Sequence, residues 1–428
     1  MIEPDLALGA RLFDELKALG ADAGGGITRD TYGPGEQAAH DLMARTAHAL
    51  GLAVRVDAAL NLYLTLPGLD RAAPAVMTGS HLDSVPRGGN YDGAAGVVAG
   101  LCVLAGWRAA GAQPRCDVTV MGIRAEESAW FPVSYIGSKA AFGLLGAADL
   151  QAPRFDTARP LAAHLQDWGG QPGLLRAGAA ALQASRVAAF VELHIEQGPV
   201  LLEAGLQAGV VSGICGSLHY RQARATGRYA HSGATPRAHR QDAVVAVAEL
   251  IAGLQQAWIE MEQQGHELTL TFGQLNTDSR QADFSKVCGR VDFCIDIRSR
   301  HPETLRHMDG RVRQAVAAIG AARGVSFDLG PQTGSQPAAM DVSLRRALKA
   351  AADAAGVACG EMPSGAGHDS AIFANQGVPT AMLFVRNANG SHNPDEAMDL
   401  ADFGAATRVM ARVLADRAAL APAPGSAT

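Results

Sequence analysis

Five residues of the types that bind divalent metals stand in short polar segments between apolar runs of this sequence. They are His81, Asp92, Glu127, His194 and His392. Imidazole nitrogens and carboxylate oxygens are the usual protein ligands of zinc and of the neighbouring transition metals. Five such ligands suit two cations that share one carboxylate. The pattern therefore predicts a hydrolase that activates water between two metals.

A second carboxylate adjoins one of these candidate ligands. Glu126 and Glu127 are neighbours in A-E-E-S, so their side chains diverge and only one needs to bind metal. The other can accept a proton from the attacking water and pass it to the leaving nitrogen. Asp83 follows His81 closely and is placed to orient that imidazole through its other ring nitrogen. We expect Glu126 to be the general base and Asp83 to support catalysis.

The elements around these residues predict how they come together. Apolar strands are expected at 75–79, 117–124 and 188–194, and they lead into His81, the glutamate pair and His194. Strands that alternate with helices and carry polar groups only at their ends indicate an open α/β sheet. Such sheets bind ligands in the crevice beyond the strand ends.

The remaining elements divide the chain into two domains. They are expected at 4–19, 35–50, 53–66, 93–111, 209–214, 218–226, 239–262, 268–276, 289–298, 302–323, 341–355, 368–375 and 379–385. The segment 209–330 predicts two helices on one face of a four-stranded antiparallel sheet, an α+β arrangement. We therefore expect a catalytic domain of 1–210 and 331–428 that is interrupted by an inserted domain of 211–330.

Composition bounds the class of protein. A length of 428 residues predicts more than one core, and the net charge of -6 argues against nucleic acid or an anionic membrane as partner. No apolar stretch is long enough to predict a membrane span, and the N-terminal residues do not resemble an export signal. The six cysteines form no C-x-x-C pair, which predicts reduced thiols and a cytoplasmic protein. The tail 421–428 is expected to be disordered.

Two residues of the predicted insert are open to two interpretations. His231 lies in a turn rich in Gly and Ser, where a solvated surface histidine is the ordinary case. Arg298 ends a predicted strand, where a salt bridge is the ordinary case. Arginine is also the side chain that best clamps a substrate carboxylate. The residues alone leave both alternatives open.

Taken in order, the motifs of this chain resemble those of one enzyme family. They are G-S-H-L-D-S-V-P-R-G-G-N-Y-D-G, A-E-E-S, E-L-H-I-E-Q-G, A-H-S-G-A-T-P, G-A-G-H-D-S and G-S-H-N-P-D-E-A. This set is similar to the amidase, hydantoinase and carbamoylase family of dinuclear metallo-amidohydrolases along nearly the whole chain. The resemblance implies an α/β fold, with an aminopeptidase-like catalytic domain around a mixed central sheet. It also implies an inserted α+β, ferredoxin-like lid domain that builds a homodimer.

The resemblance implies which residues hold each metal. One metal would be bound by His81, Asp92 and His194, and the other by Asp92, Glu127 and His392, so that Asp92 bridges the two. Zinc is the first expectation for the two divalent ions of each subunit, and manganese, cobalt and nickel also suit these ligands. A cis peptide directly after Asp92 is implied as well.

The resemblance further implies the residues that bind a small substrate with a carboxylate. Gln197, Arg298, Ser285 and Gly367 would contact the substrate, with Arg298 holding the carboxylate. His231 would reach the active site of the partner subunit and stabilise the oxyanion. A lid of this kind predicts hinges near 209–213 and 328–332.

Departures from the family pattern leave the substrate open. Trp130 stands where the family usually has arginine, which predicts a bulkier and less cationic pocket. Ser285 replaces an asparagine, and the stretch 384–387 reads F-V-R-N where F-V-P-S is usual. We expect hydrolysis of an N-carbamoyl-L-amino acid to the L-amino acid, ammonia and carbon dioxide. The alternatives are allantoate, an N-acyl-amino acid or dipeptide-like amide, and a binding protein on a catalytically dead fold.

Overall fold

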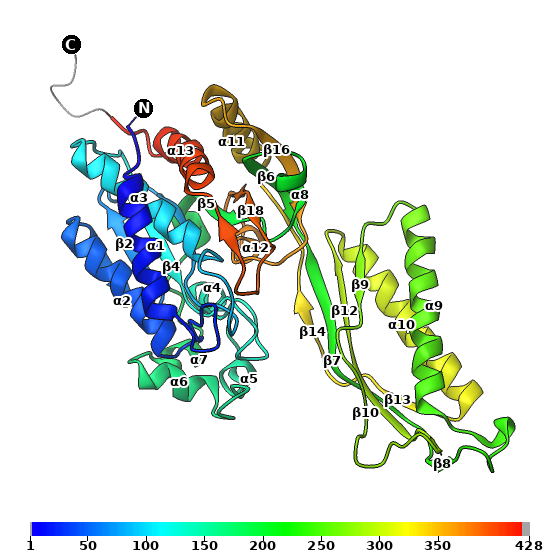
Figure 1. Cartoon of the computed structure of the whole chain (residues 1–428). Helices are drawn as coiled ribbons and strands as arrows, with labels where there is room; N and C mark the ends of the chain where they lie inside the picture. The colour runs from blue at the N-terminus through cyan, green and yellow to red at the C-terminus, as the bar shows by residue number, and fades with distance from the viewer. Residues whose placement is uncertain (1, 422–428) are drawn as a thin grey trace. The chain divides into compact units, whose positions relative to one another are not determined.

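The computed structural model describes residues 2–421 and divides into two compact units (Figure 1). Unit 1 comprises Met1–Ser212, Ala339–Ser364 and His368–Thr428, and unit 2 comprises Gly213–Ala338 and Gly365–Gly367. The tail expected to be disordered lies outside the described residues, apart from its first residue.

Unit 1 is built around a nine-stranded sheet. In spatial order its strands are β1 (Ala53–Val56), β2 (Leu62–Leu66), β4 (Val118–Ile123), β3 (Ala75–His81), β5 (Val187–Ile195), β17 (Thr380–Val385), β6 (Ala208–Ile214) and β15 (Ala338–Ala339), with β16 (Cys359–Ser364) paired to β6. β4, β3, β5 and β17 run parallel to one another, whereas β1 and β2 pair antiparallel, and β2 and β6 are antiparallel to β4 and β17. The expected α/β class with a mixed central sheet is confirmed.

One strand lies in a different sheet from the one expected. The sequence placed 209–214 with the inserted domain, and this was wrong because β6 pairs with β17 in the large sheet. Its residues are small or apolar and nearly all buried. Such a strand suits a sheet that is covered on both faces. The chain leaves unit 1 within β6, after Ser212, and returns within β15.

Helices cover both faces of the large sheet. They are α1 (Leu6–Gly20), α2 (Pro34–Ala49), α3 (Ala94–Ala109), α4 (Ile136–Ala141), α5 (Ala147–Leu150), α6 (Leu161–Asp167), α7 (Pro172–Arg176), α8 (Val200–Glu203), α11 (Val342–Ala354), α12 (Ser370–Asn375) and α13 (Leu400–Arg417), with a short 3-10 turn at Ala184–Arg186. α1, α3 and α13 pack together on one face, and Phe373 of α12 stacks on Phe190 of β5 from the other at 3.8 Å. α4 to α7, which the sequence analysis did not anticipate, enclose a separate apolar cluster.

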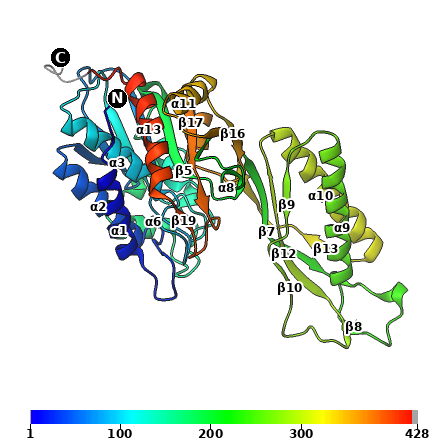
Figure 2. The same cartoon turned by 45° about the horizontal axis from the view of Figure 1, so that its top comes forward.

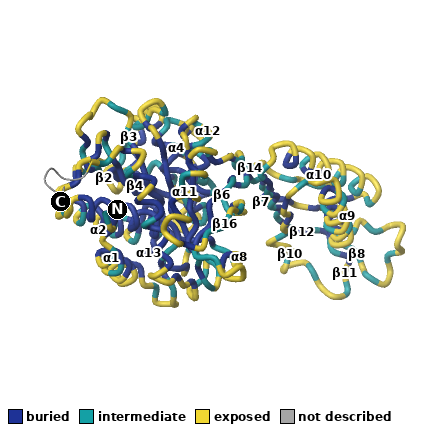
Figure 3. Tube along the Cα trace, turned by 90° about the horizontal axis from the view of Figure 1, so that it is seen from above, coloured by how far each residue is buried: buried dark blue, intermediate teal, exposed yellow. Residues whose placement is uncertain are grey.

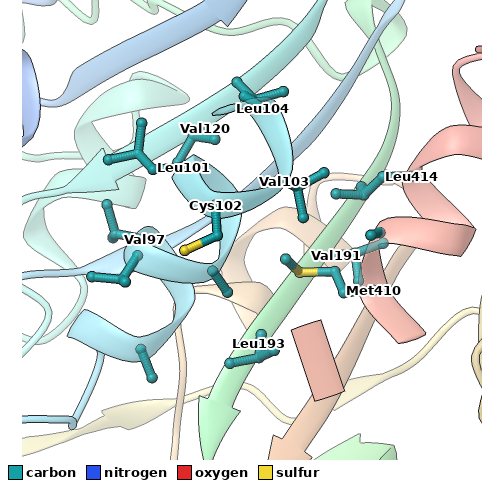
Figure 4. Close-up of a cluster of buried hydrophobic side chains, with 14 of the residues drawn as sticks. Val97, Leu101, Cys102, Val103, Leu104, Val120, Val191, Leu193, Met410 and Leu414 are labelled. Carbon is teal, nitrogen blue, oxygen red and sulfur yellow. The ribbon is translucent and has the colours of Figure 1, made fainter. Parts of the chain in front are cut away.

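α3 forms the centre of the largest core. Figure 4 shows its apolar side chains against Val191 and Leu193 of β5 and against Met410 and Leu414 of α13. A Cβ at Gly96 would lie 2.3 Å from the carbonyl oxygen of Leu193, so only glycine permits this close approach. The tight packing fixes the start of α3, which directly follows the metal-ligand candidate Asp92.

Unit 2 contains a six-stranded antiparallel sheet under two long helices. The strands are β7 (Gly216–Thr226), β9 (Thr269–Thr271), β10 (Leu275–Thr277), β12 (Arg290–Ser299), β13 (Ser326–Asp328) and β14 (Gln332–Ser335), and the helices are α9 (Ala243–Gln263) and α10 (Pro302–Arg323). β8 (Ala230–His231) and β11 (Lys286–Val287) form a separate ribbon, and a 3-10 turn spans Arg237–His239. Figures 1 and 2 show both helices along one face of the sheet. The unit has more strands than expected because 268–276 forms two short strands and β13 and β14 were not anticipated.

Among the described helices, α9 alone is long and apolar enough for a membrane span by length and composition, with a mean hydropathy of 1.3. Its buried residues are Ala243, Ala246, Val247, Leu250, Leu254, Ala257 and Met261. This helical spacing turns one side of α9 toward the core of unit 2, while its other side is exposed (Figure 3). The pattern is that of a helix packed on a sheet.

Candidate metal centre

The ends of neighbouring parallel strands bring the metal-ligand candidates together. His81 is the last residue of β3, and His194 lies near the end of β5, its parallel neighbour. The two residues are 2% and 1% exposed. Glu127 follows β4 on the other side of β3, and His392 lies in the loop after β17. Parallel strands end at one edge of a sheet, so residues distant in sequence meet there.

Asp92 lies between two groups of ligand candidates. Its Oδ1 is 3.6 Å from Nε2 of His81 and 3.2 Å from Nε2 of His194. Its Oδ2 is 3.4 Å from Nε2 of His392, which is itself 3.3 Å from Oε1 of Glu127. The carboxylate therefore presents one oxygen to each group.

Both groups fit a divalent cation. In each group the candidate ligand atoms lie within 4.8 Å of one another. Oδ1 of Asp92 is buried and has no hydrogen-bond partner among residues 2–421, as expected for an oxygen that faces a cation. The chain therefore carries candidate metal-binding groups at the edge of the sheet. The assignment of each ligand stays a prediction.

Hydrogen bonds orient the two buried imidazoles. Nδ1 of His194 lies 2.8 Å from the carbonyl oxygen of Ile195, and Nδ1 of His81 lies 3.1 Å from that of Asp83. A carbonyl only accepts, so Nδ1 carries the proton in both rings. A neutral ring with its proton on Nδ1 has its lone pair on Nε2, the nitrogen that faces Asp92 and would bind a metal.

Asp83 connects the histidine loop to the glutamate pair. Its fully buried carboxylate accepts hydrogen bonds from Thr31 Oγ1 at 2.6 Å and from the backbone N–H groups of Glu126 and Glu127 at 3.1 and 3.2 Å. Its Oδ1 also lies 3.3 Å from Nδ1 of His81. Asp83 therefore connects both segments, and its supporting role in catalysis stays a prediction.

Glu126 has the environment of an acid–base group. Burial raises its pKa well above the ordinary glutamate range, His81 opposes this rise, and the nearby carboxylates of Glu127 and Asp369 add to it. For Asp92, burial would raise the pKa, but the nearby imidazoles of His194, His392 and His81 hold it well below its usual range. Two carboxyl groups with opposite perturbations in one site are typical of divided acid–base roles.

The turn after Asp92 differs from the one that the resemblance implied. Residues 2–421 contain no cis peptide bond, so the expected cis peptide after Asp92 was wrong. Gly93 makes the turn instead, with a trans peptide and a φ of +65°. A Cβ at this position would lie 2.5 Å from the ring of His81, so the turn requires glycine.

Gln197 lies beside the bridging candidate. Its Nε2 donates to Oδ2 of Asp92 at 2.9 Å, and its backbone N–H donates to Oδ1 of Asn387 at 2.9 Å. Its amide oxygen is buried without a hydrogen-bond partner in the described chain. His392 is the most accessible ligand candidate, with 51% of its side chain exposed.

Three buried residues near the centre, Glu192, His368 and Asp369, were not among the predicted site residues. Glu192, His194 and His368 form a further group with metal-ligand spacing. Both oxygens of Glu192 are already occupied, by the hydroxyl of Ser80 at 2.7 Å and by the backbone and hydroxyl of Ser370 at 3.1 and 2.6 Å. Because His194 also directs its Nε2 to Asp92, this group supports the centre and does not form a third metal site.

His368 and Asp369 are the other two of these buried residues. The ring of His368 packs on that of His194 at 4.5 Å, and its Nε2 lies 2.9 Å from Ser364 Oγ. Asp369 accepts a hydrogen bond from Ser138, and burial first, then the charge of Glu192, raises its pKa to about 8. The motif G-A-G-H-D-S was the available signal for both residues.

Glu196, from the motif E-L-H-I-E-Q-G, and Trp130 have structural partners. Glu196 accepts hydrogen bonds from the backbone of Val200 and Leu201 at 2.7 and 2.8 Å, so it caps α8. The indole N–H of Trp130 donates to the carbonyl oxygen of Ser84 at 2.9 Å, and Arg154 lies over its ring at 4.7 Å. Trp130 therefore ties the loop after β4 to the loop after β3.

His231 and Ser285 lie together on the ribbon of unit 2, where Ser232 N–H donates to the carbonyl oxygen of Ser285 at 2.8 Å. His231 is exposed, and its Nδ1 accepts from the backbone N–H groups of Gly233 and Ala234 at 3.2 and 3.1 Å. The ring proton therefore lies on Nε2, which can donate outward. The hydroxyl of Ser285 lies 2.9 Å from an acceptor oxygen of the nearby Asp283.

Arg298 lies at the opposite end of the unit 2 sheet from His231. Its guanidinium contacts Asp296 at 3.0 Å and the carbonyl oxygen of Gly365 at 3.4 Å, and Gly367 belongs to the same short segment of unit 2. β9 pairs at the Arg298 end of β12, whereas Figure 1 shows β8 at the other end. The eight steps from Arg290 to Arg298 span roughly 26 Å at about 3.3 Å per residue.

Comparisons with known proteins agree with this architecture. The profile of the family described as Peptidase family M20/M25/M40 matches residues 77–416. An N-carbamoyl-L-amino-acid amidohydrolase of Paenarthrobacter aurescens is 34% identical, over 94% of this chain and 95% of that protein. An allantoate amidohydrolase of Escherichia coli K12 is 32% identical, over 93% and 95%. The crystal structure of an amidase of the hydantoinase/carbamoylase family from Burkholderia multivorans superimposes with a TM-score of 0.83 at 29% identity, covering 97% of this chain and 98% of that one.

Proposed function

The chain belongs to Peptidase family M20/M25/M40 and is a metal-dependent hydrolase, and from this premise we propose that it cleaves a linear C–N bond of a small N-substituted amino acid. The first candidate substrate is an N-carbamoyl-L-amino acid, because a relative of that name shares 34% identity over 94% of the chain. The observation that carries the proposal is the carboxylate of Asp92, which presents one oxygen to each of two ligand groups.

In the proposed mechanism, His81, Asp92 and His194 would hold one divalent cation, and Asp92, Glu127 and His392 would hold the other. The paired cations, zinc in the first instance, would acidify the attacking water and polarise the substrate carbonyl. Glu126 then accepts the proton of that water and returns it to the leaving nitrogen. Asp83 holds His81 and the glutamate pair in place during the reaction. The carbamate released from a carbamoyl substrate would decompose to ammonia and carbon dioxide.

The proposed substrate contacts involve both units. Gln197 would orient the reacting group, since its free amide oxygen lies beside Asp92. Arg298 would bind the substrate carboxylate with Gly367 nearby, and Ser285, which lies with His231 on the ribbon, would join the pocket from a second copy of the chain. An arginine at a strand end suits this task because its planar fork matches a carboxylate.

His231 supports a proposed homodimer. Its Nε2–H donor is of the kind that stabilises an oxyanion, which typically contributes about 2.7–4 kcal/mol per donor. A small substrate cannot reach both His231 and Arg298 of one unit 2, because the sheet separates them. We therefore assign His231 to the active site of a second copy of the chain, as a closed two-fold dimer allows.

A mixing experiment tests this assignment. His231→Ala and Arg298→Ala chains are expected to be weakly active alone. Random re-pairing of a one-to-one mixture makes half of the dimers mixed, and each mixed dimer has one intact site, so roughly a quarter of wild-type activity should return. A mixture no more active than its components would place His231 in the active site of its own chain.

The proposed reaction is tested by ammonia release from a panel of N-carbamoyl-L-amino acids. Activity should disappear after chelation and return with zinc, manganese, cobalt or nickel, and metal analysis should find two ions per chain. Undiminished turnover in metal-free protein would contradict the mechanism. A protein that binds no metal and releases no ammonia would instead be a binding protein on the same fold.

Allantoate is the second candidate substrate, because a relative named allantoate amidohydrolase is 32% identical over 93% of the chain. The same panel should therefore contain allantoate, N-acyl-L-amino acids and dipeptides. A kcat/KM for one of these that exceeds the best carbamoyl value would replace the first candidate while leaving the metal chemistry unchanged.

A further inference from the structure

Arg29 fills the interior of the loop that joins His81 to Asp92. Its side chain is fully buried, at 0% exposure. Nε donates to the carbonyl oxygen of Leu82 at 2.7 Å, while Nη1 and Nη2 donate to Oδ1 and the carbonyl oxygen of Asn90 at 3.1 and 3.3 Å. One guanidinium therefore holds both ends of the loop between these two ligand candidates.

The backbone around Arg29 pairs with the same loop. Ile27 and Gly88 exchange backbone hydrogen bonds of 2.9 and 2.8 Å. The N–H of Ser84 donates to the carbonyl oxygen of Arg29 at 2.9 Å, and the hydroxyl of Ser84 accepts from the N–H of Arg29 at 2.9 Å. Buried backbone carbonyls need donors, and the guanidinium supplies several in a fixed planar arrangement.

Glu396 holds the other side of the same turn. Its Oε1 accepts from the backbone N–H groups of Tyr91 and Asp92 at 2.8 and 3.3 Å. The hydroxyl of Ser391 lies 2.6 Å from Glu396 Oε2 and 2.6 Å from Oδ2 of Asp92. Since Glu396 and Ser391 come from the loop of His392, they connect the two ligand groups through Asp92.

Arg29 and Glu396 place opposite charges on the two sides of the Asp92 turn. In the described chain the hydrogen bonds of the Arg29 guanidinium go to neutral oxygens. Burial lowers the pKa of Arg29, and the carboxylates of Glu396, Asp92 and Asp83 raise it. For Glu396, burial and Asp92 raise the pKa, whereas Arg29 is among the groups that lower it. A buried charge needs compensation, and each of the two residues contributes some to the other across the turn.

We propose that Arg29 and Glu396 are positioning residues that fix the direction of both Asp92 oxygens and thereby set the affinity of the paired metal site. The inference rests on the proposed bridging role of Asp92. Arg29 acts through the backbone before Asp92, and Glu396 acts through the backbone at Asp92 and through Ser391. Removing either residue lets the carboxylate rotate, so that one oxygen no longer faces each ligand group.

The test compares the metal affinities of Arg29→Met, Arg29→Lys and Glu396→Gln with that of the wild type, by competition with a chelator. Arg29→Met and Glu396→Gln should bind the metal ions about 10- to 100-fold more weakly than the wild type. This is the range typical of substitutions at residues that orient metal ligands. Arg29→Lys keeps the charge but cannot hold both loop ends, so its affinity should lie between. The dimanganese forms should show weakened spin coupling in electron paramagnetic resonance, because coupling reports a shared bridging ligand.

Arg154→Met is the matched control. Arg154 is also a buried arginine, but it pairs with Asp30 and Asp156 and lies over the ring of Trp130, so none of these contacts is to the loop between His81 and Asp92. The Arg154→Met substitution should lower the unfolding temperature of the protein and leave its metal affinity and spin coupling unchanged. If Arg29→Met does not fold, the nearly isosteric Glu396→Gln carries the test.

The outcomes separate the inference from the proposed function. A wild-type protein that binds no metal pair would overturn the proposed function. A wild type with two coupled metals, together with Arg29 and Glu396 variants of unchanged affinity and coupling, would overturn only the inference. The inference also fails if Arg154→Met weakens metal binding as much as Arg29→Met, because general destabilisation would then explain both.

Discussion

The two units hold their candidate functional residues in contrasting ways. In unit 1, Asp92 lies within 3.6 Å of three imidazoles, and buried groups such as Asp83 fix the ligand segments. In unit 2, His231 is exposed and Ser285 is partly exposed, and their side chains contact mainly residues close to them in sequence. A metal centre needs its ligands preset, because small displacements weaken binding, whereas substrate-binding residues can lie on exposed turns and strand ends.

The second difference is whether a single chain supplies all the residues of the candidate site. All ligand candidates of unit 1 meet at one edge of one sheet. In unit 2, His231 and Arg298 lie at opposite ends of β12, and Arg298 is already paired with Asp296. A substrate carboxylate must therefore compete with Asp296, and the proposed site needs a second chain. Substitutions in unit 1 should accordingly abolish chemistry, and those in unit 2 should alter binding.

The largest effect is expected at Glu126. Glu126→Gln removes the proposed base but keeps its shape, and should lower kcat about 10²- to 10⁴-fold, the usual contribution of general acid–base catalysis. Metal content should be unchanged, because Glu127 and not Glu126 is the proposed ligand. Glu203→Gln, on the exposed side of α8, is the control. An active Glu126→Gln enzyme would refute the mechanism.

A smaller loss is expected at Arg298. Arg298→Ala removes hydrogen bonds between charged groups, worth about 1.5–3 kcal/mol, so kcat/KM should fall roughly 10- to 100-fold. The loss should appear mainly in KM, unlike the loss at Glu126. Arg300→Ala, whose side chain pairs with Glu267, is the control. Equal losses in both variants would indicate damage to the sheet.

A change of substrate preference is expected when Ser285 is substituted. Ser285→Asn restores the residue usual in the resembled family and places an amide next to the His231 ribbon. The ratio of kcat/KM values for carbamoyl substrates and allantoate should change by about tenfold or less, as one added polar contact allows. Ser285→Ala is the control for loss of the hydroxyl. An unchanged ratio would remove Ser285 from the proposed pocket.

The smallest effect is expected on the folding stability of unit 1. His40 is buried in α2, neither ring nitrogen has a hydrogen-bond partner within residues 2–421, and burial holds its pKa well below 6.5. Below pH 6.5 the unfolded chain therefore binds a proton that the folded protein does not, and stability falls as the pH falls.

His40→Leu should remove this penalty. Denaturant unfolding below pH 6.5 should show a wild-type stability that decreases relative to the variant by about 1.4 kcal/mol per pH unit. His48→Leu, on the exposed surface of the same helix, is the control. Parallel pH profiles for wild type and His40→Leu would contradict the expectation.

Much of unit 1 could be predicted because its signals are local. β3 and β5 are largely apolar runs with a histidine at or next to their last residue, and an apolar run that stops at a polar residue marks a strand end. The family resemblance and the α/β class were confirmed for the same reason. β6 was assigned to the wrong sheet because a short apolar strand carries no information about its partner.

The supporting residues could not be predicted in this way. Arg29 and Glu396 have the appearance of surface charges in the sequence, and only the folded loops show that both are buried. His368 stands in a quoted motif but far from His194 along the chain. The implied cis peptide was wrong because Gly93 reaches the required turn with a left-handed conformation.

The sequence by itself determined the chemical types of the ligands and their places at strand ends, because ligand chemistry and strand periodicity are properties of short segments. Only the tertiary structure decided that Asp92 turns one oxygen to each group and that Arg29 lies within its loop. It also decided that His231 and Arg298 lie at opposite ends of one sheet. The direction of a side chain, its burial and its distance from other residues are set when distant segments pack together. They therefore cannot be read from any single segment.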